Sequence, residues 1–277
     1  MSSPIHLDFN QAPADIVEIM DETRAQAAIS QAQAKQYRRL LWLLFFAGLA
    51  MFLVDFLLGY NFLTCSIVGV VLILLTLGGR YLLRHRLQPP RFGSQFDLTR
   101  DLLHTIRDDI PAKKTIVGQL DLTGARQESK RYRQKKAASG RPVSYYRDEW
   151  LKLKGNLYDG NVLRLSLVEK EKVREGFYKR SRISGKRKWK TGSSNAIHMA
   201  SIGISANPDR FVVPPVDLTG RSIPESRFAV AESAVGQGRV SLKLVASQPI
   251  GAWDVLNALQ FAYQHIEPRQ PKPGQES

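Results

Sequence analysis

Residues 40–79 read LLWLLFFAGLAMFLVDFLLGYNFLTCSIVGVVLILLTLGG, and Asp55 is the only charged side chain among them. The turn Gly59-Tyr60-Asn61 divides this stretch into two apolar runs, which we place at 40–60 and 62–83. Each run has about the 20 apolar residues that a helix needs to cross a bilayer. Neither run has the polar stripe that a helix in a soluble core turns toward water. We therefore predict a transmembrane helical hairpin over residues 40–84.

The charges beside the two runs predict their orientation. Lys and Arg close to a membrane helix tend to stay in the cytoplasm. They flank both runs here and are absent from the turn: Lys35, Arg38 and Arg39 come before the first run, and Arg80, Arg84, Arg86 and Arg91 come after the second. We expect a multi-pass protein of the plasma (inner) membrane with both termini in the cytoplasm.

Asp55 is a candidate intramembrane polar site, because carboxylates within hydrocarbon are costly and often mark proton or ion paths. It lies about five residues, or roughly 7 Å at 1.5 Å per residue, from the turn. At that depth the carboxylate is expected to reach water near the interface. A transport function would require oligomerisation.

The rest of the chain divides by composition and periodicity. We expect a mostly helical N-terminal cytoplasmic segment at 1–39, untethered before Pro13, and a linker at 85–94 that contains Pro89 and Pro90. A cytoplasmic α+β domain at 95–266 follows, and the Pro- and Gln-rich tail at 267–277 is expected to be disordered.

The α+β domain is expected to open with a helix at 97–110 and to continue with about seven mainly antiparallel strands. Apolar residues in a helical pattern at 252–266 predict a closing amphipathic helix. The expected strands lie at 116–122, 150–157, 161–169, 173–182, 186–190, 196–205, 227–232 and 239–246. A membrane hairpin followed by such a domain resembles the bacterial pleckstrin-homology-like membrane proteins in architecture, although no sequence motif carries the resemblance.

One hairpin allows its register to be derived. A two-residue loop between 150–157 and 161–169 would mix the two faces of the sheet. A three-residue loop, Tyr158-Asp159-Gly160, instead pairs Leu153 with Leu165 and Leu151 with Leu167, and its glycine supplies the left-handed position. We therefore predict the three-residue loop.

Positive charge is concentrated in one part of the chain. The net charge is +15, and residues 126–190 hold 21 Lys and Arg against 7 Asp and Glu. Within this block, 126–141 is expected to be a mobile basic loop, and alternating cations are expected to share strand faces. The candidate residues for binding an anionic surface are Lys130, Arg131, Arg133, Lys135, Lys136, Arg174, Arg180, Arg182, Lys186, Arg187, Lys188 and Lys190.

Three interpretations of the basic block stay open. A basic domain tethered to the membrane gains about 1 kcal/mol per Lys or Arg near an anionic leaflet. Aromatic residues among the cations also suit single-stranded nucleic acid, although no RNA-binding consensus is present. The third interpretation is a solvated face that meets an acidic protein partner. We expect a binding or scaffolding module for the membrane surface or an acidic partner, with nucleic acid as an alternative and oligomerisation open.

Catalytic motifs are not apparent in the sequence. The five histidines are scattered, with no second ligand at metal spacing, and His198 on a predicted strand is the only one that merits inspection. No phosphate loop is recognisable, so we expect no cofactor and no metal, and an enzyme without a recognisable motif is an alternative. The repeated Asp-Leu-Thr-Gly at 121–124 and 217–220 is expected to form turns at strand ends.

Overall fold

The computed structural model describes residues 6–58, 63–85, 92–137, 140–181 and 183–269. It contains two compact units, a helical unit between residues 19 and 92 and a β-sheet unit formed by residues before 19 and after 92. Within the described residues the fold is α+β, with four α-helices and a mainly antiparallel sheet of eight strands.

Two long helices make up the helical unit, α1 (Pro13–Leu58, whose first residues belong to the β-sheet unit) and α2 (Leu63–His85). They pack closely because glycines face the contact: a Cβ on Gly48 would lie 2.9 Å from the carbonyl oxygen of Gly69. Farther along, the guanidinium of Arg80 lies 4.8 Å from the centroid of the Trp42 ring. The two helices therefore run antiparallel, as a hairpin.

Large apolar side chains on both helices face away from this contact. Leu43 is 67% exposed and Leu75 is 62% exposed, and Phe46, Val54, Val70 and Leu74 are also exposed. Among the described residues, one stretch, Ser66–Leu83, is long and apolar enough to cross a membrane, with a mean hydropathy of 2.0 and only 11% of its residues buried. Asp55 lies on α1, and its side chain is outside the described residues.

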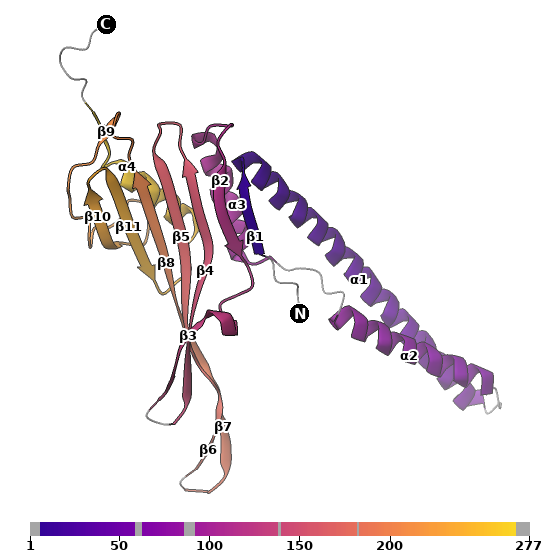
Figure 1. The fold of residues 1–277 in the computed structure, drawn as a ribbon. Helices are drawn as coiled ribbons and strands as arrows, with labels where there is room; N and C mark the ends of the chain where they lie inside the picture. Colours follow the sequence, from indigo (N-terminus) through magenta and orange to yellow (C-terminus); the bar gives the residue numbers. More distant parts are fainter. Residues whose placement is uncertain (1–5, 59–62, 86–91, 138–139, 182, 270–277) are drawn as a thin grey trace, which may run out of the picture. The chain divides into compact units, whose positions relative to one another are not determined.

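The sheet follows the order β1-β2-β4-β5-β8-β11-β10, and β3 pairs with β4 beyond β2 (Figure 1). Its strands are β1 (His6–Gln11), β2 (Ile116–Asp121), β3 (Arg131–Lys136), β4 (Pro142–Asn156), β5 (Val162–Arg174), β8 (Ser193–Ser205), β10 (Val230–Gly236) and β11 (Arg239–Ala246). Two small separate sheets pair β6 (Phe177–Arg180) with β7 (Arg187–Lys190), and β9 (Phe211–Val212) with β12 (Glu267–Pro268).

One face of the main sheet is covered by helices. Behind the sheet in Figure 1 lie α3 (Ser94–Ile106), which the short helix η1 (Arg107–Asp109) extends, and α4 (Ala252–Tyr263). Alternate residues of the central strands pack under these helices, so the core contains fully buried side chains such as Leu102, Leu151, Leu167, Ile202 and Ile204. Among the described residues, no α-helix of the β-sheet unit covers the opposite face (Figure 1). Because strand residues alternate between faces, the polar residues between these leucines and isoleucines point to the helix-free side.

The predicted hairpin register is confirmed. Leu153 pairs with Leu165 and Leu151 with Leu167, and Gly160 in the loop has a φ of +86°. The repeated Asp-Leu-Thr-Gly segments form turns, as predicted. The backbone N–H of Thr123 donates to Asp121 at 2.9 Å, and that of Thr219 donates to Asp217 at 2.9 Å. In each turn the glycine that follows, Gly124 or Gly220, has a positive φ.

Three segments differ from the sequence predictions. Part of the segment expected to be untethered, 6–11, forms β1, which pairs in register with all of β2. Instead of a mobile loop, 131–136 forms β3, because the backbone pairs with β4 although all six side chains are exposed. Glu267 and Pro268, expected in the disordered tail, pair with β9 as β12. In these segments backbone pairing with a neighbour fixes the structure without a continuous buried face.

The expected strand at 173–182 is also divided in the structure. β5 ends at Arg174, and β6 begins at Phe177 after Glu175 and Gly176. The expected strand contained both Arg174 and Tyr178. In the structure these residues lie on different strands. The expected strand at 227–232 lies instead at Val230–Gly236, while β11 has the predicted bounds.

Candidate anion-binding surface

The basic block contains cations of two kinds, and those of the first kind are paired with carboxylates. Lys130 Nζ lies 2.6 Å from Asp148 Oδ1 and 2.8 Å from Asp121 Oδ2, and the side chains of Lys130 and Asp148 are only 14% and 1% exposed. Arg126 donates to both carboxylate oxygens of Glu171, at 2.5 and 2.9 Å. Because it is paired and mostly covered, Lys130, a candidate from the sequence, is not part of the exposed surface. Arg131 is also paired, with Glu128 at 2.7 Å.

Burial and charge act in opposite directions on the two carboxylates beside Lys130. Burial raises the pKa of Asp148, although the hydrogen bond from Lys130 opposes this effect. Burial also acts to raise the pKa of Asp121, but hydrogen bonds from Lys130 and Thr123 outweigh it and leave this pKa lowered. Lys130, Asp121 and Asp148 therefore form a coupled group, the Lys130 triad, whose cation holds two carboxylates together.

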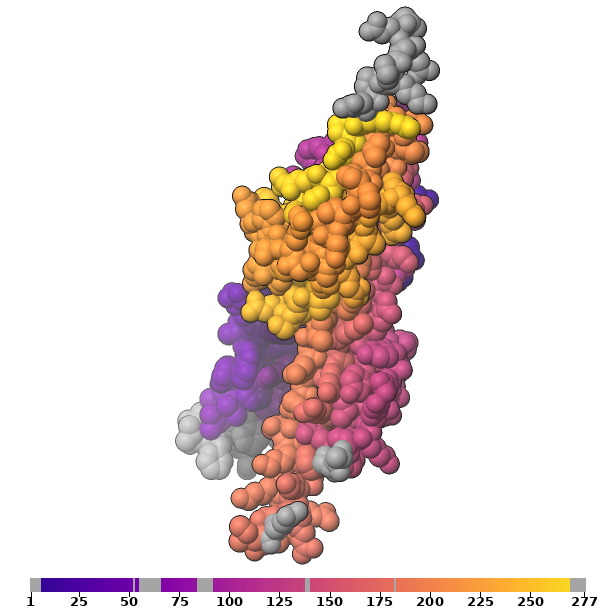
Figure 2. All heavy atoms as spheres, turned by 90° about the vertical axis from the view of Figure 1, so that its left-hand side faces the viewer, coloured from indigo at the N-terminus to yellow at the C-terminus, as the bar shows by residue number. Residues whose placement is uncertain are grey.

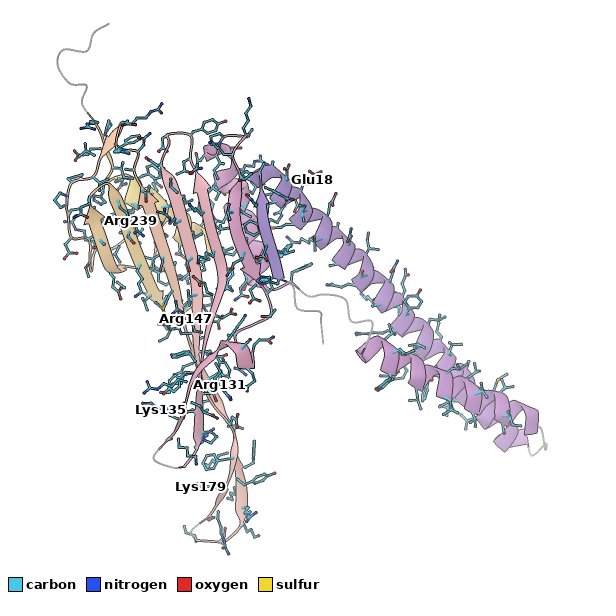
Figure 3. The ribbon with its side chains drawn as sticks, viewed as in Figure 1. Glu18, Arg131, Lys135, Arg147, Lys179 and Arg239 are labelled. Atoms are coloured by element: carbon cyan, nitrogen blue, oxygen red, sulfur yellow. The ribbon has the colours of Figure 1, made fainter. Side chains whose placement is uncertain are left out.

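Cations of the second kind are exposed at the end of the sheet where two hairpins extend. The β3–β4 hairpin and the β6–β7 hairpin project there beyond the rest of the sheet (Figures 1 and 2). Figure 3 labels Lys135 on the first hairpin and Lys179 on the second. Within the described residues the following exposed cations of the two hairpins have no carboxylate partner: Arg133, Lys135, Lys136, Lys179, Lys186, Arg187, Lys188 and Lys190. Arg174, the last residue of β5, is also exposed and has no carboxylate partner among the described residues.

The β6–β7 hairpin places like charges directly opposite each other. Lys179 pairs with Lys188 across the strands, and Arg180 pairs with Arg187. Like charges in this position destabilise an antiparallel ladder. Arg180 is a predicted candidate that also donates to the carbonyl of Gly185 at 3.0 Å. Arg182, another candidate, lies outside the described residues.

Aromatic and aliphatic side chains are exposed on the same hairpin. Tyr178 and Trp189 face each other across the strands with ring centroids 4.9 Å apart, and both are more than half exposed. Ile183, in the connecting turn, is 100% exposed. The β6–β7 hairpin therefore combines unpaired cations with apolar surface that no described residue covers.

Arg141 fixes the base of the β6–β7 hairpin. Its guanidinium donates to the carbonyls of Glu175, Arg174 and Thr191, the last two at 3.2 and 3.1 Å. The same group lies 4.8 Å from the centroid of the Phe177 ring. One side chain thus connects both strands of the hairpin base to the β3–β4 connection, a role that its position in a basic run did not indicate.

A shallow hollow of about 600 Å³ lies on the β3, β4, β5 and β8 strands beside the hairpins. Tyr132 and Tyr145 line it, with ring centroids 6.3 Å apart, and Lys172 Nζ lies 5.7 Å from the Tyr145 ring centroid. Lys170 also lines this hollow. Exposed rings next to cations are the groups that stack on bases in single-stranded nucleic acid.

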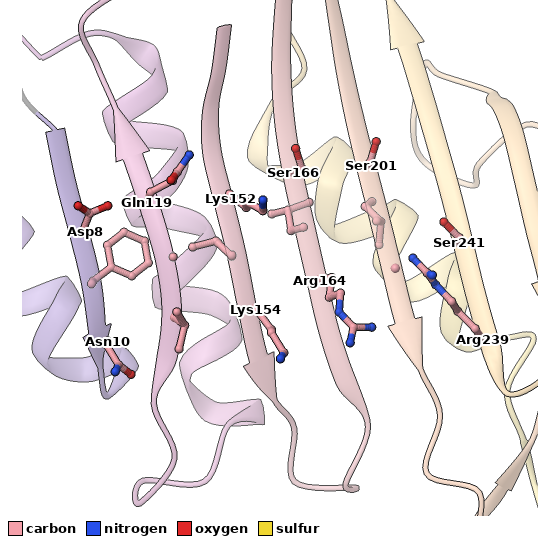
Figure 4. A pocket seen from close by; sticks show the side chains of 17 residues that line it. Asp8, Asn10, Gln119, Lys152, Lys154, Arg164, Ser166, Ser201, Arg239 and Ser241 are labelled. Carbon is pink, nitrogen blue, oxygen red and sulfur yellow. The ribbon is translucent and has the colours of Figure 1, made fainter.

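A second hollow lies on the helix-free face of the sheet and has a volume of about 680 Å³ (Figure 4). We call it the open-face hollow. Its cations are Lys152 and Lys154 on β4, Arg164 on β5 and Arg239 on β11, and small residues lie between them: Ser166, Ser201, Gly203 and Ser241. The sequence prediction did not include these cations, although Lys152 and Lys154 alternate with buried leucines in the predicted hairpin. Arg239 could not be connected to them without the strand order.

His198 is the histidine that the sequence singled out for inspection. His198 pairs in register with Glu169, and burial raises the pKa of that glutamate. The described residues contain no group of three His, Cys, Asp or Glu side chains placed to hold a metal ion.

Comparisons with models of known protein families, with curated proteins and with solved structures find no match to this chain.

Proposed function

We propose that this chain is an integral membrane protein whose basic β domain lies in the cytoplasm and binds the anionic surface of the inner leaflet through the β6–β7 hairpin. In this proposal α1 and α2 form a two-helix membrane anchor. The observation that carries the proposal is the β6–β7 hairpin, where unpaired cations and exposed Trp189, Tyr178 and Ile183 occur together.

The anchor is supported by the outward apolar surface of the α1–α2 hairpin. Soluble proteins rarely expose contiguous apolar patches larger than a few hundred Å². The exposed leucines, valines and phenylalanines of both helices make such a patch unfavourable in water and favourable in hydrocarbon. The close contact at Gly48 and Gly69 is also typical of membrane helices, where small residues allow backbones to approach.

Binding to the leaflet is supported by the chemistry of the β6–β7 hairpin. Five or six cations near an anionic surface contribute about 1 kcal/mol each, and the interaction falls off within a Debye length. Trp and Tyr rings favour the headgroup region of a bilayer. Like-charge pairs across the β6–β7 ladder lose their repulsion when anionic headgroups surround them.

The test uses the full chain in lipid nanodiscs, with Cys65→Ser and Ile183→Cys so that a polarity-sensitive fluorophore labels the turn of the hairpin. We expect a blue shift in nanodiscs rich in phosphatidylglycerol and none in phosphatidylcholine nanodiscs. The double variant Lys188→Glu/Lys190→Glu should abolish the shift. The matched control Lys113→Glu/Lys114→Glu makes the same change in net charge at exposed residues outside the hairpins and should retain it.

Several outcomes would contradict leaflet binding. An equal shift in neutral nanodiscs would mean that charge does not drive the interaction. No shift in either lipid, combined with binding of an acidic protein, would assign the hairpin to a protein partner. Tight binding of an oligonucleotide that weakens steeply with salt would favour the nucleic-acid alternative, which the Tyr132–Tyr145 hollow supports.

A further inference from the structure

The open-face hollow contains two arginines from the strands on either side of β8. Arg164 on β5 donates from Nη1 to Ser205 Oγ on β8 at 2.8 Å, and Arg239 on β11 pairs in register with the same serine. Gly203, two residues before Ser205, forms part of the floor: a Cβ there would lie 3.4 Å from Arg239 Nη2. The guanidinium of Arg239 thus lies beside Gly203, and that of Arg164 lies at Ser205, two residues farther along β8 (Figure 4).

The charges of this hollow are not balanced within the β domain. Lys152, Lys154 and Arg239 have no ion-pair partner among the described residues, and Asp8 on β1 is the only carboxylate that lines the hollow. The nearby Lys243 is paired with Glu232 at 2.7 Å, and Glu149 accepts a hydrogen bond from Ser166 at 2.6 Å. Four cations therefore face one carboxylate across an open floor.

The geometry favours phosphate over other anions. A guanidinium group can donate two parallel hydrogen bonds to the oxygens of one phosphate, and serine hydroxyls add donors on the same surface. The cations extend from β4 to β11, three strand spacings or roughly 14 Å at about 4.8 Å each. One phosphate group is too small to contact all four. The hollow lies on the strands of the main sheet, whereas the leaflet-binding groups lie on the projecting β6–β7 hairpin.

We propose that the open-face hollow binds a soluble small molecule that carries two or more phosphate groups. Arg164 and Arg239 hold one phosphate above Gly203, and Lys152 and Lys154 neutralise another toward β4. Ser201 and Ser241 lie beside the floor and donate hydrogen bonds to phosphate oxygens or to hydroxyls of the ligand.

The test measures binding of inorganic tripolyphosphate by calorimetry to the full chain in phosphatidylcholine nanodiscs at fixed ionic strength. These neutral nanodiscs remove any contribution from an anionic leaflet, so the result does not depend on leaflet binding by the β6–β7 hairpin. We expect saturable binding at one site per chain. Arg164→Gln/Arg239→Gln should weaken it at least about tenfold, because two charge-assisted contacts are lost. Gly203→Val should also weaken it, because the valine fills the floor while every charge remains.

The matched control is Lys113→Gln/Lys114→Gln, which removes two positive charges at exposed residues outside the hollow and the hairpins and should change the affinity less than about twofold. Thermal unfolding verifies that each variant is folded. If Gly203→Val does not fold, the affinity of Arg164→Gln/Arg239→Gln decides the outcome. Equal losses in the control and the Arg164/Arg239 variant, or no saturable binding, would overturn the proposal. So would equally tight binding of an oligoglutamate peptide, or much tighter binding of an oligonucleotide that the same variants abolish.

Discussion

At the scale of single residues, the Lys130 triad separates structural charge from surface charge. Lys130 and Lys136 both occur in a run of cations, yet the Lys130 side chain is mostly covered and contacts two aspartates, whereas Lys136 is exposed on β3. The folded-state pKa of Asp121 is lowered, so its stabilising contribution is present above the ordinary Asp pKa of about 3.9 and is lost as the pH falls through the lower folded value. Asp148 has the opposite sign, because burial raises its pKa.

We predict that Lys130→Met destabilises the β domain by about 3–5 kcal/mol at pH 7, because it leaves two carboxylates together without a cation. Both carboxylates become neutral as the pH falls, so the deficit should shrink below about pH 4. Urea unfolding followed by tryptophan fluorescence measures this. Lys136→Met is the control and should change the free energy of unfolding by less than about 0.5 kcal/mol. A deficit that is the same at pH 7 and pH 3 would contradict the triad.

Single residues also show why the candidate site could be predicted from the sequence only in part. The sequence identified the basic block and the cations of β3, β6 and β7, because charge can be counted without a structure. It could not distinguish Lys130 from its exposed neighbours, because Asp121 and Asp148 are distant in sequence. Nor could it connect Arg239 with Arg164, since β11 and β5 are separated by β8 in the sheet.

At the scale of elements, Arg141 determines how firmly the β6–β7 hairpin is held. It is the only described side chain that donates to the carbonyls of both Arg174 and Thr191, which lie on the two sides of the hairpin base. A two-stranded hairpin by itself is marginally stable in water. The ordering of β6 and β7 therefore depends on this anchor.

We predict that Arg141→Ala increases hydrogen exchange of the amides in 177–190 at least about tenfold, while exchange in β5 and β8 stays unchanged. The reason is that three carbonyls lose their donor and Phe177 loses its cation contact. Hydrogen exchange with mass spectrometry measures it. Arg133→Ala, which removes an exposed cation from β3, should have no such effect. Unchanged exchange in both variants would show that the hairpin is stable without the anchor.

Elements with one buried and one solvated face were predictable, and the others were not. Leucines at alternate positions of β4 and β5, together with Gly160, fixed the register of that hairpin. All side chains of β3 are exposed, so its sequence has no alternation to detect, and its pairing depends on β4. β1 shows the alternation of Leu7 and Phe9 with polar residues, but it is short and adjoins α1.

At the scale of the whole molecule, the surplus of positive charge occurs in two places with different chemistry. The projecting β6–β7 hairpin combines cations with exposed aromatic rings, which suits a lipid surface. The open-face hollow combines arginines with small residues, which suits compact phosphate groups. In the proposed function, the apolar α1–α2 hairpin lies in a bilayer and holds the β domain beside it. The membrane anchor is therefore the central claim.

Alkaline-carbonate extraction of membranes from cells that produce the full chain tests this claim most directly. High pH removes peripheral proteins held by charge, including a basic domain bound to anionic lipid, but leaves helices within hydrocarbon in place. We predict that the chain stays in the membrane pellet, and that Lys188→Glu/Lys190→Glu stays there as well. Recovery of the chain in the supernatant would contradict the membrane anchor.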